Sequence, residues 1–136
     1  MARIKNPLAL HALGLIIGLV LEYLLGMTTN LYVHFPEGVQ GGAAWEFAWS
    51  QIPLALHIIL GLLLFVGAVA LAIRSTRSRN KVWIRASGLG LLAIFLSAFG
   101  GSSFIPTQKD YYSFLMSISF LVALLSYFWG IYKSKA

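Results

Sequence analysis

The sequence contains no cysteine and very little charge. Of its 136 residues, 10% are charged and only 4 are acidic, whereas 59% are hydrophobic. The absence of cysteine excludes disulfides, thiolate metal sites, iron–sulfur clusters and a cysteine nucleophile. A soluble domain of this size cannot bury so much apolar surface. The composition therefore predicts a single integral membrane domain.

The shortage of acidic residues also limits the catalytic chemistry. Three of the 4 acids, Glu37, Glu46 and Asp110, lie between apolar runs rather than inside them. No paired carboxylates, serine–histidine–acid triad or phosphate-binding loop can be assembled from the remaining residues. We therefore expect no ordinary hydrolytic enzyme.

Long apolar runs are what the sequence has in abundance. Asn6 and Pro7 are typical of a helix start, Gly26 of a helix end, and Pro53 and Pro106 mark further borders. A transmembrane helix needs about 20 apolar residues. The sequence predicts an all-α fold, a four-helix antiparallel transmembrane bundle, with spans at 7–26, 52–73, 82–100 and 111–132.

The longest connection, residues 27–51, contains a helical pattern of its own. Trp45 and Trp49 are four residues apart and share one helical face. We predict a short helix near 43–50 that lies in the membrane interface, where indole rings anchor at headgroup depth. The alternative is a lid over an outer pocket, and His34 in this loop is expected to be solvated.

The basic residues are distributed unevenly. Because loops rich in Lys and Arg stay in the cytoplasm, we predict cytoplasmic termini and a multi-pass protein of the cytoplasmic membrane. The basic loop can also contact anionic lipid headgroups, and no nucleic-acid site is implied because the cations do not share an amphipathic face. All 10 basic residues except Lys109 lie at the ends or between the second and third spans: Arg3, Lys5, Arg74, Arg77, Arg79, Lys81, Arg85, Lys133 and Lys135.

Three ionisable residues fall inside the predicted spans. His11 and His57 each end the sequence Pro-Leu-Ala-Leu-His, and Glu22 follows on the first span. Ionisable groups at membrane depth are expensive, so each needs a partner or a function. One alternative is that each histidine only hydrogen-bonds a helix carbonyl. Glu22 can likewise form a simple buried hydrogen bond with a histidine.

A bound haem b is the functional alternative. Gly14, Gly18 and Gly61 lie on the histidine faces and can leave a flat slot for a macrocycle, with His57 and His11 as axial ligands. A rise of 1.5 Å per residue separates the histidines by about 15 Å in depth, so we expect one haem or two near opposite leaflets. The glycines have a second interpretation, close helix packing.

Further side chains complete these candidate sites. Met116 shares the depth of His57 and Glu22 and can complete a His/Met haem, and the same set can instead hold a metal ion. Arg74 and Arg85, together with Arg77, can pair with haem propionates near His11. We therefore predict electron transfer, with a quinone or redox protein as partner. The alternative is a non-catalytic accessory subunit or scaffold of a larger respiratory or metal-dependent complex, and the chain can also form homo-oligomers.

Two resemblances accompany this interpretation. The segment Phe99-Gly100-Gly101-Ser102-Ser103-Phe104, followed by Asp110, Ser113 and Met116, resembles a pattern in small four-helix membrane proteins of archaea and actinobacteria, which implies a four-helix fold and no assigned reaction. More loosely, the helices that begin Leu-Ala-Leu-His look like those of b-type cytochromes of the b561 kind and of one half of haem A synthase, which implies haem binding. The chain departs from them in lacking paired histidines and the glutamate–histidine–arginine signature.

Overall fold

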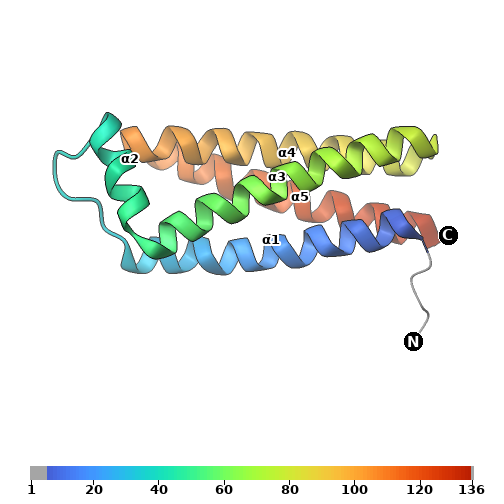
Figure 1. Ribbon diagram of the computed structural model, residues 1–136. Coiled ribbons are helices and arrows are strands. Elements are labelled where there is room, and N and C mark those ends of the chain that lie inside the picture. The colour runs from blue at the N-terminus through green and yellow to red at the C-terminus, as the bar shows by residue number, and fades with distance from the viewer. Residues whose placement is uncertain (1–5, 136) are drawn as a thin grey trace.

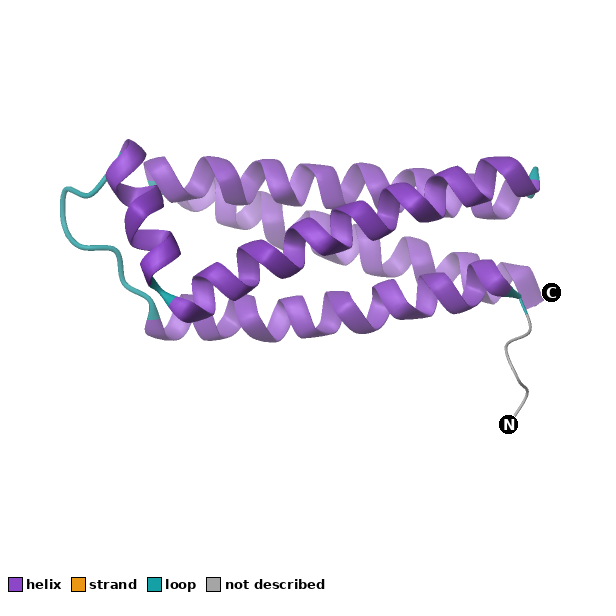
Figure 2. Ribbon diagram, in the orientation of Figure 1, coloured by secondary structure: helices purple, strands orange, loops and turns teal. Residues whose placement is uncertain are grey.

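The computed structural model describes residues 6–135 and consists of helices joined by loops (Figures 1 and 2). Over this range there are no strands, and four of its helices are long and apolar enough to cross a membrane. The predicted all-α fold with four spans is confirmed, and the protein is an integral, multi-pass membrane protein. The helices are α1 (Pro7–Tyr32), α2 (Gly41–Ser50), α3 (Ile52–Ser78), α4 (Lys81–Thr107) and α5 (Asp110–Lys135).

Several helix ends follow the capping signals of the sequence. The Asn6 side chain accepts a hydrogen bond from the Leu8 N–H at 2.9 Å, with Pro7 in the first turn. Asn80 accepts in the same way from the first N–H groups of α4. Arg79 ends α3 in the left-handed conformation, with a φ of 54°. These local signals therefore determine where α1 and α4 begin.

Two predicted borders were wrong. α1 does not end at Gly26 but continues to Tyr32, because Gly26 keeps a helical backbone and faces α3. α4 does not end before Pro106; this proline lies inside its last turn, one residue before the helix ends at Thr107. A proline there removes only one backbone hydrogen bond, which the helix tolerates so close to its end. The helices consequently exceed the predicted spans.

The four long helices form a ring of neighbours. α1 packs against α3 and α5, and α4 packs against the same two helices, while α2 lies across the ends of α3 and α4 (Figure 1). The core of the ring is built from small and aliphatic side chains together with Trp83 and Tyr127, both of which are fully buried. Large apolar side chains cover much of the outward surface, as expected for lipid contact, among them Leu10, Ile17, Leu62, Val66, Phe114 and Leu121.

The two ends of the bundle differ in charge. Both ends of the described chain and the α3–α4 turn lie at one end, and α2 with the α4–α5 turn lies at the other (Figure 1). The first end carries Arg74, Arg77, Arg79, Lys81, Arg85 and Lys133, whereas the second carries Glu37, Glu46, Lys109 and Asp110. Arg3 and Lys5 lie outside the described residues. The separation of charge that the sequence predicts is therefore also a separation in space.

Candidate functional site: a glutamate–histidine pair between α1 and α3

The structure brings Glu22 of α1 against His57 of α3. The histidine Nδ1 and the carboxylate Oε1 are 3.1 Å apart, and the side chains are only 26% (His57) and 14% (Glu22) exposed. His57 lies in the second turn of α3 and Glu22 well inside α1, so the contact is formed between two spanning helices. We call these two residues the glutamate–histidine pair.

Two glycines make room for this pair. A Cβ at Gly61 would lie 2.9 Å from Glu22 Oε1, and a Cβ at Gly26 would lie 3.2 Å from the Cε1 of His57. Each ionisable side chain thus rests on a glycine of the opposite helix, and each of these glycines is four residues from the other member of the pair. The arrangement is reciprocal because α1 and α3 run antiparallel.

The pair has hydrogen-bonding capacity left over. Although Nδ1 and Oε1 are close, neither His57 Nδ1 nor Glu22 Oε2 completes a hydrogen bond within the described residues. Both atoms are buried. A carboxylate beside an imidazole can share a proton, orient the ring for a ligand at its other nitrogen, or bind a polar group from a partner.

His11 occupies a separate position near the other end of the same helix interface. Its Nδ1 lies 3.0 Å from the Nη1 of Arg74 on α3. A guanidinium only donates, so Nδ1 is the acceptor and the neutral ring carries its proton on Nε2. In this arrangement His11 has no lone pair left for a metal ion. Because His11 and Glu22 are eleven residues apart on α1, about 16 Å along its axis, the two histidines form independent sites.

Met116 does not join His57. Its thioether packs in the α4–α5 interface, where a Cβ at Gly101 would lie 3.2 Å from the sulfur and one at Gly100 would lie 3.0 Å from Met116 Cγ. His57 instead lies in the α1–α3 interface. In residues 6–134 no three His, Asp or Glu side chains group closely enough to hold a metal ion.

The remaining predicted site residues have different surroundings. A Cβ at Gly18 would lie 2.6 Å from Leu64, so Gly18 serves close packing, as Gly61 does beneath Glu22. Gly14 faces open space. Arg85 is exposed on α4, and His34 is exposed in the loop before α2, as predicted. Leu64 and Glu22 occupy the space beside Gly18 and Gly61, and the predicted haem stays a prediction.

Sequence reasoning missed two features of the site. The first is the role of Gly26, which the sequence predicts to be a helix end. Gly26 lies four residues after Glu22 on the same helix face, and this spacing was the available signal that it belongs to the site. Trp83 was not singled out, yet it is fully buried against Gly130 and its indole N–H has no partner among the described residues. Nothing in the sequence around Trp83 distinguishes a buried indole from an interfacial one.

Comparison with known proteins gives a distant similarity to a respiratory protein. No protein-family model and no solved structure matches the chain. The chain is 28% identical over 99 residues to an NADH-quinone oxidoreductase subunit of Koribacter versatilis (strain Ellin345). The aligned region covers 73% of this chain and 22% of that protein, so the chain spans about a fifth of the length of this relative. The resemblance noted for residues 99–104 stays a prediction.

Proposed function

We propose that the protein is a non-catalytic helical subunit of a larger membrane complex that transfers electrons to or from quinone. The similarity to a subunit of an NADH–quinone oxidoreductase supports this class of complex. The observation that carries the proposal is the glutamate–histidine pair. It lies within the spanning helices, yet part of both side chains is left uncovered by the bundle itself. An ionisable pair at membrane depth is strongly disfavoured in contact with lipid, so a second protein surface covers it.

The test is assembly in native membranes. A tagged chain is extracted in a mild detergent and separated on a native gel that is stained for NADH oxidation with a quinone analogue. We expect the protein to migrate in an active band far above its own 14.9 kDa. Migration as an isolated small bundle, with the NADH-oxidising activity elsewhere, would refute the proposal.

A matched pair of double variants tests whether the glutamate–histidine pair forms the contact. Glu22→Leu with His57→Leu removes both ionisable groups at once, so no orphaned charge remains to unfold the bundle. Glu46→Leu with His34→Leu makes the same chemical change at exposed positions outside the interface. We expect the first variant to fold but leave the complex, and the second to remain in it. Equal retention of both variants would assign the contact to another surface.

We propose a second candidate function, binding of a b-type haem through His57 Nε2. A carboxylate at the other ring nitrogen, as Glu22 is here at 3.1 Å, is the usual partner of a metal-ligating histidine. Because side chains fill the glycine positions, such a haem would have to lie outside the α1–α3 interface, and Met116, which packs between α4 and α5, would not be its ligand.

Absorption spectra of the purified complex test this candidate. We expect a Soret band and a reduced α-band that are lost in His57→Ala and kept in His34→Ala, a histidine change in the exposed loop. Met116→Leu should leave the spectrum unchanged because the sulfur packs against Gly101. Absence of both bands after expression with ample haem would eliminate the candidate and leave the subunit proposal standing.

A further inference from the structure

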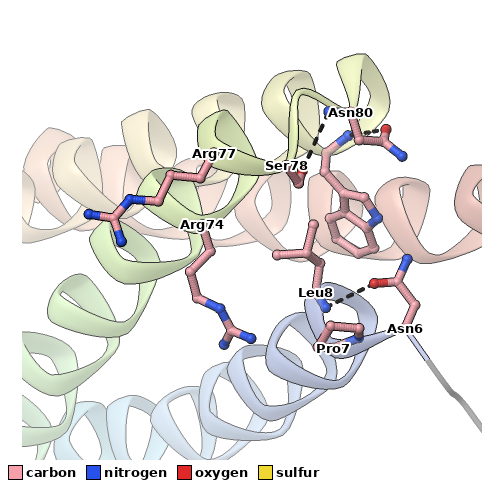
Figure 3. Close-up of a pocket in the computed structure, with 8 residues that line it drawn as sticks. Asn6, Pro7, Leu8, Arg74, Arg77, Ser78 and Asn80 are labelled. Atoms are coloured by element: carbon pink, nitrogen blue, oxygen red, sulfur yellow. Dashed lines mark hydrogen bonds between the residues drawn. The ribbon is translucent and has the colours of Figure 1, made fainter.

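A cavity of about 410 Å³ opens at the basic end of the bundle, where the starts of α1 and α4 meet the end of α3 (Figure 3). Arg74 and Arg77, one turn apart on α3, line one part of it. Pro7, Leu8 and Trp83 form an apolar wall. We call this space the arginine cavity. It lies apart from the glutamate–histidine pair, which is nearer the opposite end of α1 and α3.

Among residues 6–135 no carboxylate pairs with either of the two arginines. Glu22 is engaged with His57, and the three other acids of the chain lie at the opposite end of the bundle. Arg74 is held in place by His11, which accepts from one guanidinium nitrogen at 3.0 Å and leaves the remaining N–H groups of the fork available. In Figure 3 the Arg74 side chain extends from α3 towards α1. The cavity therefore carries positive charge that no described carboxylate compensates, and His11 holds the Arg74 part of it.

The position of the cavity matches the depth of lipid headgroups. α1 has 26 residues and α3 and α4 have 27 each. At 1.5 Å per residue these helices are about 40 Å long, which exceeds a hydrocarbon core of about 30 Å. Their ends consequently emerge among the headgroups, so an occupant would meet the Arg74 guanidinium on one side and apolar carbons on the other, with Arg77 adding positive charge nearby.

We propose that the arginine cavity binds the phosphate group of an anionic phospholipid headgroup. Guanidinium forks match phosphate oxygens in charge and geometry, and basic pockets between spanning helices are suited to such headgroups. The exposed carbons of Pro7 accommodate the glycerol carbons, in front of the buried side chains of Leu8 and Trp83. A soluble phosphate shares the same recognition chemistry, so the experiment separates the two sources.

The experiment uses the full chain in nanodiscs of phosphatidylcholine containing one quarter phosphatidylglycerol. Lipid that stays bound after detergent extraction is quantified by mass spectrometry. The test variant is Arg74→Gln with Arg77→Gln. The matched control, Arg79→Gln with Lys133→Gln, removes the same charge from the same end at residues that do not line the cavity. In parallel, inorganic phosphate is added to pure phosphatidylcholine nanodiscs and the unfolding temperature is recorded.

We expect the lipid bound to the native chain and to the control to be enriched in phosphatidylglycerol. In the test variant this enrichment should be about tenfold lower. A second outcome is that inorganic phosphate raises the unfolding temperature of the native chain but not of the test variant, while no lipid is enriched. This result would support the phosphate site and assign it a soluble ligand. Equal losses in test variant and control would show diffuse surface attraction and overturn the proposal. Absence of both enrichment and phosphate stabilisation in the native chain would overturn it as well.

Discussion

Gly88 and Gly90 are two residues apart on α4 but have different surroundings. A Cβ at Gly90 would lie 2.5 Å from ring atoms of Tyr127, whereas a Cβ at Gly88 would meet nothing within 4 Å. The Tyr127 side chain is fully buried. The same residue type is therefore a packing requirement at one position and free to change at the other.

This contrast gives a stability prediction. Gly90→Ala should destabilise the bundle by about 1–3 kcal/mol, because overpacking forces the α4 and α5 backbones apart. Gly88→Ala should change stability by less than about 1 kcal/mol, in the stabilising direction, since alanine is the better helix former. Unfolding in mixed micelles titrated with dodecyl sulfate, followed by circular dichroism, measures both. Equal stability of the two variants would contradict the packing of Tyr127 on Gly90.

At the same scale, Glu22 and His57 should be energetically coupled. In a double-mutant cycle each residue is replaced by leucine. Each single variant leaves one partly buried ionisable side chain without its partner, whereas the double variant contains neither ionisable side chain. We expect a coupling energy of about 0.6 kcal/mol and at most about 1.7 kcal/mol, the average and the maximum for polar contacts between spanning helices. The same cycle at His34 and Glu46, both exposed, should give no coupling. Additive effects at Glu22 and His57 would show that their 3.1 Å approach contributes nothing.

At the scale of elements, α2 is attached to the bundle through its smallest residues. Ala44 and Ala48 are fully buried and pack with Leu54 of α3 and Ile105 of α4. The side chain of Gln108 donates to the Val39 carbonyl at 2.6 Å, which ties the preceding loop to the end of α4. α2 is therefore a packed cap on the bundle rather than a helix held by the interface alone.

A larger side chain on the buried face should release this cap. Ala48→Phe places a ring where no space exists, at a cost of about 1–3 kcal/mol, and we expect α2 to detach while the four long helices remain. Ala43→Phe, on the exposed face, should have no such effect. Hydrogen exchange of the α2 amides reports the difference directly. Unchanged protection in Ala48→Phe would mean that α2 is held by contacts other than its alanine face.

At the scale of the whole molecule, the separation of charge predicts an orientation in the membrane. We propose that the basic end faces the cytoplasm, because Lys and Arg are retained on that side of the membrane. The chain has no cysteine of its own, so introduced thiols can be labelled without background. In intact cells a membrane-impermeant maleimide should label His34→Cys and should label Thr76→Cys only after permeabilisation. Labelling of Thr76→Cys from outside would reverse the proposed topology.

The sequence by itself determined the helical class, the number of spans, the start of α1 at Pro7 and the grouping of charge. Each of these follows from local properties: the length of an apolar run, a capping side chain, or the count of cations in a loop. The ends of α1 and α4 were harder to predict. Gly26 and Pro106 are helix breakers in isolation, but the folded chain uses one as a contact surface and tolerates the other in a final turn.

Only the tertiary structure decided which ionisable side chains meet. Residue spacing placed Glu22, His57 and Met116 at one depth but could not give the rotation of each helix about its axis or the choice of neighbours around the ring. The helix rotations and the choice of neighbours depend on which side chain packs against which glycine. Glu22 packs against Gly61, and Met116 packs against Gly101. His57 therefore faces a carboxylate in the α1–α3 interface instead of a thioether, because close packing of helix pairs, rather than shared depth, determines contact.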